Sequence, residues 1–205
     1  MAHLRKGAGV QSKVLAITGM ESLTAGSCSA LVRVSKIVAF ACFTTIAAQL
    51  SVPLPFTPVP LTMQTLFVVM AGLTLGARDG FYAMLAYVSL GFAGAPVFAE
   101  LSGGPHVLLG PTGGYLAAFP AAALVAGWIS EKLGGNRFAA FAASLCGMAL
   151  ILAAGASYLS IIAGISFARA ASLGILPFAA GELVKALIAS IPPAGRAAFR
   201  AIPRS

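Results

Sequence analysis

The sequence predicts an all-α, polytopic membrane protein in which six helices cross the bilayer. Hydrophobic residues make up 59% of the chain and charged residues only 9%, whereas a soluble domain carries about 25% charged residues. The apolar residues gather in six runs, each close to the roughly 17–25 residues that span a bilayer as a helix. One helical bundle uses most of the 205 residues, so the sequence predicts no second sizeable domain.

The six runs follow one another with short connections. We expect the membrane-spanning helices at residues 35–52, 60–77, 80–97, 111–130, 138–164 and 177–194. The fifth run is longer than a crossing needs, so its helix is expected to tilt or to extend past the membrane surface. We expect residues 1–33 to form a cytoplasmic tail, residues 34–195 the six-helix domain, and residues 196–205 a basic cytoplasmic tail.

Basic residues lie between the apolar runs in a one-sided pattern. They are Arg5, Lys6, Lys13, Arg33, Lys36, Arg78, Lys132, Arg137, Arg196, Arg200 and Arg204. With six crossings all of them fall on one side, and the opposite connections contain no base before Arg169. The positive-inside rule therefore predicts a plasma-membrane (inner-membrane) protein, surrounded by lipid, with both termini in the cytoplasm. This placement explains the net charge of +8 without a nucleic-acid partner.

The two longest connections on the opposite side are rich in proline and glycine. "SVPLPFTPVPLTMQT" (51–65) holds four prolines in eight positions with Phe56 among them, and "GFAGAPVFAELSGGPHVLLGPTGGY" (91–115) includes Phe98. Proline fixes φ and lacks an N–H donor, so the first connection is expected to be stiff and non-helical. Irregular backbone at membrane depth occurs where protein covers it or where it lines a cavity. We therefore expect a cavity that opens outward between these connections.

"GPTGGY" (110–115) opens the fourth run. A proline suits the first turn of a helix, where free N–H groups meet polar or anionic ligand groups. Gly113 and Gly114 would allow a close approach of backbone or ligand, and Tyr115 offers an aromatic face with a polar tip. Simple helix packing with an interfacial tyrosine explains the same motif.

Glu182 and Lys185 stand three residues apart in the last apolar run, "GELVKALIAS". This spacing places them on one face of a helix. Each charge costs about 2.5–3.5 kcal/mol at the centre of a membrane helix by insertion scales. A self-neutralising ion pair is one explanation. Such a pair seldom improves stability over apolar residues, so a functional role is the other.

Few other residues indicate ligand binding, metal binding or catalysis. The amide of Gln64 is suited equally to a neighbouring helix and to a ligand. His106 has no second histidine or acidic cluster near it, so no metal site is predicted. The sequence contains neither a G-x-x-x-x-G-K-[ST] motif nor a signature of nucleophilic catalysis. We therefore expect no enzyme activity and no cofactor.

Four stretches together resemble one known family. "PLPFTPVPLTMQT", "GAPVFAELSGG", "LLGPTGGYLAAF" and "LPFAAGELVK", in this order, are similar to the BioY family, the biotin-binding S components of energy-coupling factor (ECF) vitamin transporters. The likeness covers about residues 37–190. It implies a six-helix membrane fold with an outward-facing biotin pocket.

The resemblance also implies site residues. The family's Gly-Asp-x-x-Lys pattern on the last helix falls on Gly181, Glu182 and Lys185, with Glu in place of Asp. A carboxylate and an ammonium can satisfy the ureido ring of biotin, while its valerate carboxylate could take Lys185 or a helix N-terminus instead. Phe56, Phe98 and Tyr115 are candidates for the apolar wall around the bicycle.

The resemblance further implies partners. Family members dock a membrane coupling subunit through small residues on their first helix. The corresponding stretch, "AFACFTTIAAQL", pairs Ala41 with Thr45 and Thr44 with Ala48 at a spacing of four, which permits close helix approach. Packing inside the bundle itself explains these small residues equally well.

The resemblance thus implies a membrane subunit that captures biotin outside and delivers it inward, driven by a coupling protein and two ATPases. Binding of another small vitamin and a proton-coupled carrier remain alternatives. An intramembrane enzyme with Glu182 as base and a helical scaffold have less support, because no partner nucleophile is present and a scaffold needs no stiff loops.

Overall fold

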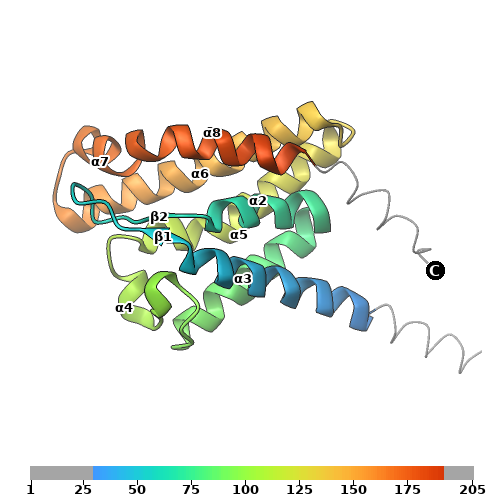
Figure 1. Ribbon diagram of the computed structural model, residues 1–205, viewed down its shortest axis with the longest axis horizontal. Helices are drawn as coiled ribbons and strands as arrows, with labels where there is room; N and C mark the ends of the chain where they lie inside the picture. The colour runs from blue at the N-terminus through green and yellow to red at the C-terminus, as the bar shows by residue number, and fades with distance from the viewer. Residues whose placement is uncertain (1–29, 192–205) are drawn as a thin grey trace, which may run out of the picture. The chain divides into compact units, whose positions relative to one another are not determined.

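The computed structural model describes residues 30–191, and helices dominate them (Figure 1). The chain divides into a first unit, Met1–Lys36, of which only the helical residues 30–36 are described, and a second unit, Ile37–Ser205. The elements in chain order are the helix Ala30–Gln49, β1 (Ser51–Val52), β2 (Leu61–Thr62), α2 (Gln64–Leu75), α3 (Ala77–Phe92), η1 (Ala99–Leu101), α4 (Pro105–Leu108), α5 (Gly113–Lys132), α6 (Arg137–Ala163), α7 (Phe167–Gly174) and α8 (Leu176–Ser190).

Each of the six predicted runs overlaps a helix of 12 to 27 residues, which confirms the all-α class. Three helices are long and apolar enough to cross a membrane, namely Ala30–Gln49, α5 and α6, and α7 with α8 makes a fourth crossing if this pair, bent by 48°, is one span. α2 is apolar but has only 12 residues. The structure therefore supports a polytopic membrane protein, and the count of six crossings stays a prediction.

Glycine residues, which have no side chain, allow three helices of the bundle to approach one another closely. α5 packs against α6, α3 and α2. A Cβ atom on Gly72 of α2 would lie 2.1 Å from the Ala123 carbonyl oxygen of α5, and one on Gly127 would lie 2.5 Å from the backbone nitrogen of Ala77 in α3. Small residues are the usual means of close helix packing in membranes. The core of the bundle is built at these contacts.

A short pairing of strands closes the proline-rich connection. Ser51 pairs with Thr62 and Val52 with Leu61 in an antiparallel register. The prediction that the connection at residues 51–65 is non-helical is confirmed as far as Met63, but the strands were not predicted. Because Leu61–Thr62 is paired with β1, the second helix begins at Gln64 and not at residue 60.

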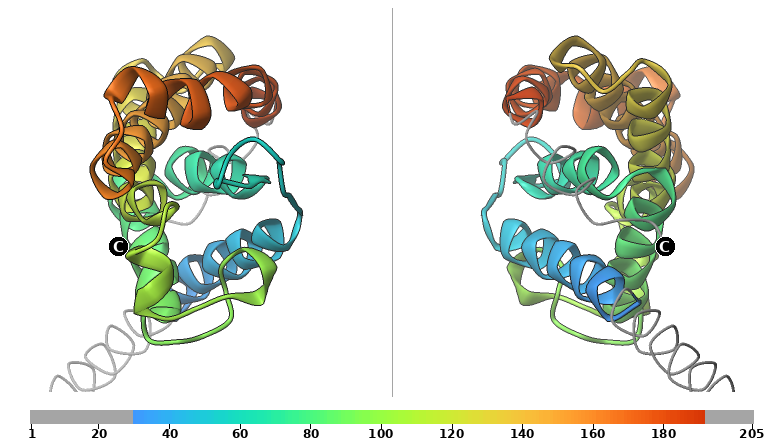
Figure 2. Two further views of the ribbon diagram at one scale, coloured as in Figure 1. Left: turned by 90° about the vertical axis from the view of Figure 1, so that its left-hand side faces the viewer. Right: turned by 90° about the vertical axis from the view of Figure 1, so that its right-hand side faces the viewer.

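The irregular connections gather at one end of the bundle. β1, β2, α4 and α7 lie toward the left of Figure 1, and the left view of Figure 2 looks onto this end. The connection between α3 and α5 contains the short elements η1 and α4, and two of its non-glycine residues, Glu100 and Leu101, have positive φ (59° and 53°). Backbone of this kind needs support from side chains around it.

The connection before the last predicted run, residues 177–194, contains a short helix that sequence reasoning did not find. α7 ends at Gly174 and α8 begins at Leu176, with Pro177 in its first turn. Proline lacks the N–H that would continue the hydrogen-bond ladder from α7. The side chain of Ser166 accepts from the backbone N–H of Arg169 at the start of α7 (3.4 Å). That N-cap serine was the signal in the sequence that could have predicted α7.

Candidate functional site

A cavity of about 250 Å³ lies at the end of the bundle that carries the irregular connections. Its wall comes from the proline-rich connection, the turn at residues 98–102, the start of α5, the middle of α6 and the first half of α8. Small-molecule pockets in proteins are commonly about 300–1,000 Å³. The cavity is just below this range, so it has room for a small organic molecule.

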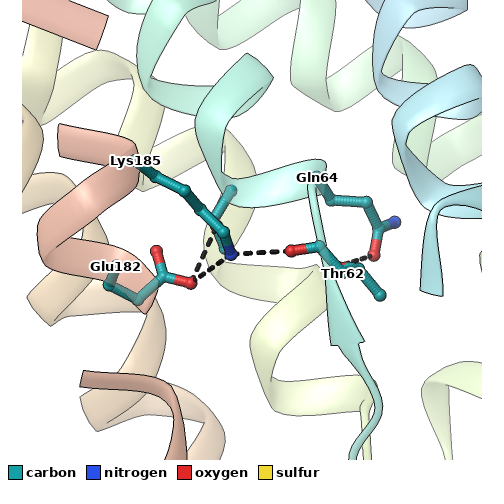
Figure 3. A network of polar contacts seen from close by, with 5 residues as sticks. Thr62, Gln64, Glu182 and Lys185 are labelled. Atoms are coloured by element: carbon teal, nitrogen blue, oxygen red, sulfur yellow. Dashed lines mark hydrogen bonds and ion pairs between the residues drawn. The ribbon is translucent and has the colours of Figure 1, made fainter. Parts of the chain in front are cut away.

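The two charged residues of α8 form a buried ion pair beside this cavity. Glu182 and Lys185 are 5% and 4% exposed, and Lys185 Nζ lies 2.7 Å from Glu182 Oε1. Nζ also donates to the Thr62 carbonyl oxygen (2.6 Å) and to Thr65 Oγ1 (3.0 Å), as Figure 3 shows in part. An ammonium has three N–H donors, and these three acceptors occupy them all. Lys185 is therefore saturated by protein groups, and it does not line the cavity.

Glu182 has an unused acceptor. Its Oε1 accepts from Lys185 and from the Thr65 hydroxyl (2.9 Å), and Glu182 lines the cavity. Its Oε2 is buried and has no hydrogen-bond partner within the described part of the chain. A buried carboxylate oxygen without a donor is costly. The carboxylate thus offers a strong acceptor to a ligand that brings an N–H or O–H group into the cavity.

Further hydrogen bonds connect this pair to α3. The Thr62 hydroxyl donates to Gln64 Oε1 (3.0 Å), Gln64 Nε2 donates to the Tyr87 hydroxyl (2.6 Å), and that hydroxyl donates to the Val97 carbonyl (2.9 Å). Gln64 also lines the cavity. Its amide therefore bonds a neighbouring helix, as one of the two alternatives predicted, and contact of Gln64 with a ligand stays a prediction.

Aromatic side chains form the apolar part of the wall. Phe98 is buried with its ring edge-to-face against Tyr87 (centroids 5.6 Å apart). Tyr115 is buried too, and its hydroxyl donates to the Gly174 carbonyl (3.0 Å) at the break between α7 and α8. A Cβ atom on Gly155 would lie 2.2 Å from the Tyr115 ring, so this glycine makes room for it. Phe98 and Tyr115, two of the three predicted aromatic residues, thus line the cavity.

Two further aromatic residues of the wall were missed by sequence reasoning. Phe119 and Phe178 line the cavity and are buried. Phe119 follows Tyr115 by four residues in α5, and Phe178 precedes Glu182 by four residues in α8. Residues four apart share a helix face. This spacing was the signal that could have predicted them.

Two predicted ligand residues lie away from the cavity. Phe56 is 58% exposed and is not part of the cavity wall. Gly113 is buried where a Cβ atom would lie 1.8 Å from the Leu108 carbonyl oxygen, so its lack of a side chain serves packing against α4. The neighbouring Thr112 does line the cavity. A ligand role for Phe56 and Gly113 stays a prediction that this geometry does not favour.

The predicted docking residues pack within the chain. Ala41 and Ala48 are buried, and the Thr45 hydroxyl donates to the Ala41 carbonyl (3.0 Å) in the same helix. This burial favours the alternative that the small residues of the first helix serve the bundle itself. Among residues 30–191 no group of three metal-ligating side chains comes together.

Comparisons with known proteins agree on one family. The model of the BioY family matches residues 20–201. The probable biotin transporter BioY of Pyrococcus horikoshii is 44% identical over 158 residues, which cover 77% of this chain and 91% of the relative. The biotin transporter BioY of Thermotoga maritima is 39% identical over 153 residues, 74% of this chain and 88% of the relative.

A solved structure has the same fold. The S-component for biotin from an ECF-type ABC transporter is similar with a TM-score of 0.77 and 26% sequence identity, over 84% of this chain and 93% of that one. These relatives are transporters or transporter components and not enzymes.

Proposed function

The chain belongs to the BioY family, and we propose that it is a membrane-embedded S component that captures biotin from the outer side. The observation that carries the proposal is the buried carboxylate of Glu182, which lines the cavity and keeps Oε2 free of any described partner. An apolar cavity with a few convergent polar groups is the usual form of a small-molecule site. Biotin combines an apolar bicycle with two N–H donors and fits both features.

The free acceptor suggests which end of biotin lies deepest. The ureido ring brings two N–H donors, and a carboxylate oxygen accepts from such donors in charge-assisted hydrogen bonds. The valerate carboxylate would instead repel Glu182, and Lys185 has no donor left to receive it. We therefore place the ureido ring at Glu182 and assign Lys185 the role of holding Glu182 in position.

The rest of the ligand follows from this orientation. The thioether-containing bicycle would contact Phe98, Tyr115 and Phe178, which supply apolar surface along the wall. No cationic side chain is among the residues that line the described cavity. The valerate chain would thus extend toward Pro58, an exposed part of the wall, where water can solvate its carboxylate.

Delivery of biotin inward needs an energy source, and we propose an ATP-driven module with a transmembrane coupling subunit and two ATPases. The likeness to an S-component of an ECF-type ABC transporter supports this, and the sequence contains no P-loop motif. The chain would lie in the plasma membrane with residues 34–195 as the binding domain. Cytoplasmic tails at 1–33 and 196–205 rest on the one-sided basic residues alone, because residues 1–29 and 192–205 lie outside the described part.

Binding to the purified, detergent-solubilised protein tests the proposal. We expect biotin to bind tightly, and thiamine and riboflavin not to bind. Glu182→Gln should weaken biotin binding by about 1.5–3 kcal/mol, the range for a hydrogen bond to a charged group. A folded protein that binds none of the three vitamins would contradict the proposed function.

Two biotin analogues test the orientation separately. Biotin methyl ester keeps both ureido N–H groups and neutralises the valerate, so it should bind nearly as well as biotin. A ureido-N-methylated biotin loses a donor and should bind poorly to the wild type. If the ester binds poorly and the N-methyl analogue binds well, the ligand lies the other way round.

A further inference from the structure

The turn at residues 98–102 forms one side of the cavity and has an unusual backbone. Phe98, Ala99, Glu100 and Ser102 all line the cavity. The turn is closed by hydrogen bonds from the Phe98 N–H to the Ser102 carbonyl (3.0 Å) and from the Ser102 N–H to the Ala99 carbonyl (3.2 Å). At its tip Glu100 and Leu101 both adopt left-handed φ angles. For residues with a side chain this conformation is unfavourable, because Cβ crowds the carbonyl oxygen.

One side chain from outside the turn holds this conformation. Gln49, the last residue of the first helix, donates from Nε2 to the Phe98 carbonyl (3.0 Å) and accepts at Oε1 from the Leu101 N–H (3.0 Å). Its second amide hydrogen bonds the Thr45 carbonyl within its own helix (3.2 Å). A single planar amide therefore joins the two ends of the strained segment, and its anchor to the helix fixes where that segment lies.

We propose that Gln49 is a positioning residue for the ligand: its amide clamps the 98–102 turn in the conformation that completes the cavity wall. Strained backbone persists only where the surrounding structure enforces it, and it concentrates at ligand sites. The inference rests on the proposed function, because the ligand whose binding it affects is biotin. Gln49 itself does not line the cavity, so its effect passes through the turn.

The turn should survive the loss of this clamp without unfolding the bundle. The Phe98 ring is buried against Tyr87. Gly91 leaves room for this ring, because a Cβ atom on residue 91 would lie 2.0 Å from it. These contacts fix Phe98 but leave Glu100 and Leu101 free to leave the left-handed region once Gln49 no longer holds them. We expect a looser cavity wall in an otherwise folded protein.

The test is equilibrium binding and dissociation of radiolabelled biotin on purified wild type, Gln49→Ala and Gln49→Ala/Leu101→Gly. Gln49→Ala should raise Kd about tenfold, which corresponds to about 1.4 kcal/mol, mainly through faster dissociation, with an unchanged number of sites per folded protein. Glycine adopts left-handed φ without a Cβ penalty. Leu101→Gly should therefore restore most of the affinity in the double variant.

A matched control distinguishes the loss of the Gln49 clamp from the loss of a side-chain hydrogen bond elsewhere in the protein. Ser157→Ala removes a bond from an exposed serine hydroxyl to the Ala153 carbonyl within α6 and changes no residue of the cavity wall, so biotin affinity should stay unchanged. If Gln49→Ala folds poorly, Gln49→Met keeps the side-chain length without the amide and is measured in the same way.

The outcomes distinguish this inference from the proposed function. A wild type that binds biotin, with a Gln49→Ala or Gln49→Met variant of unchanged Kd, would overturn the clamp alone. A drop in the number of binding sites with the same Kd in the folded remainder would reduce Gln49 to a stability role and also overturn it. A folded wild type that does not bind biotin would overturn both.

Discussion

At the scale of single residues, Glu182 and Lys185 have unequal roles in one ion pair. Lys185 gives all three donors to Thr62, Thr65 and Glu182, whereas Glu182 lines the cavity and its Oε2 has no hydrogen-bond partner among the described residues. A buried pair of this kind contributes little net stability, but the loss of one partner strands the other charge. The pair and Thr65 hold the Glu182 carboxylate in place at the cavity wall, where the proposed ligand would bind.

This division of roles predicts the behaviour of two variants. Lys185→Met leaves the Glu182 carboxylate buried without a counter-charge and should cost about 3–5 kcal/mol of folding free energy. Glu182→Met/Lys185→Met removes both charges and should recover most of that stability, yet should not bind biotin. Thermal unfolding in detergent and biotin binding, measured on the same samples, provide the check. A double variant that still binds biotin would remove the pair from the ligand site.

Much of the site could be predicted at this scale, within limits set by distance along the chain. The i, i+3 spacing of Glu182 and Lys185 correctly placed them on one buried helix face. Their partners Thr62 and Thr65 come from about 120 residues earlier, and no local pattern connects such segments. Phe56 was taken as a wall residue from its place in the proline-rich connection, but strand pairing at residues 51–52 and 61–62 leaves it exposed.

At the scale of elements, the break between α7 and α8 is held by a side chain of the cavity wall. The Tyr115 hydroxyl donates to the Gly174 carbonyl at that break, where a proline leaves backbone groups without helical partners. In membranes such groups need partners from neighbouring helices. Tyr115 therefore serves both as aromatic wall and as the tie that positions the start of α8, which carries Phe178 and Glu182.

Tyr115→Phe tests the tie, because it keeps the ring and removes only the hydroxyl. The variant leaves the Gly174 carbonyl without its hydrogen bond, which should lower the free energy of unfolding by about 1–3 kcal/mol. Backbone hydrogen exchange around residues 174–178 should become faster. Tyr158→Phe is the matched control, since the Tyr158 hydroxyl donates to the Leu108 carbonyl of α4 (3.1 Å) and not to a residue of this break. Equal exchange rates at residues 174–178 in wild type and Tyr115→Phe would show that the hydroxyl does not hold the break.

Long elements were predictable and short ones were not. The lengths of the hydrophobic runs located six helices, because each of these helices presents apolar side chains to lipid or to the core over many successive residues. The strands β1 and β2 have two residues each, too few for a periodic signal. α7 has eight residues and fell in the connection between the predicted runs 138–164 and 177–194, because it is too short to form an apolar run of its own.

At the scale of the whole molecule, the fold is shared with the S-component structure at only 26% identity. Such divergence is possible because close helix packing asks for small residues at few positions, such as Gly72 and Gly127, and for apolar residues elsewhere. Orientation and tail location, by contrast, were inferred from charge alone. The energy source is likewise a property of the assembly, which a single chain's sequence reveals only through resemblance.

The energy source can be tested by uptake of radiolabelled biotin into cells that express this chain with an ECF module. We expect uptake to persist when an ionophore collapses the proton gradient while ATP is maintained, and to stop when the module's ATPases are inactivated. A proton-driven carrier would need Glu182 or Lys185 to exchange protons with each side in turn, but Lys185 is bound by three acceptors and both residues are buried. Uptake that continues without ATPase activity and fails with the proton gradient would contradict the S-component proposal and favour the proton-coupled carrier.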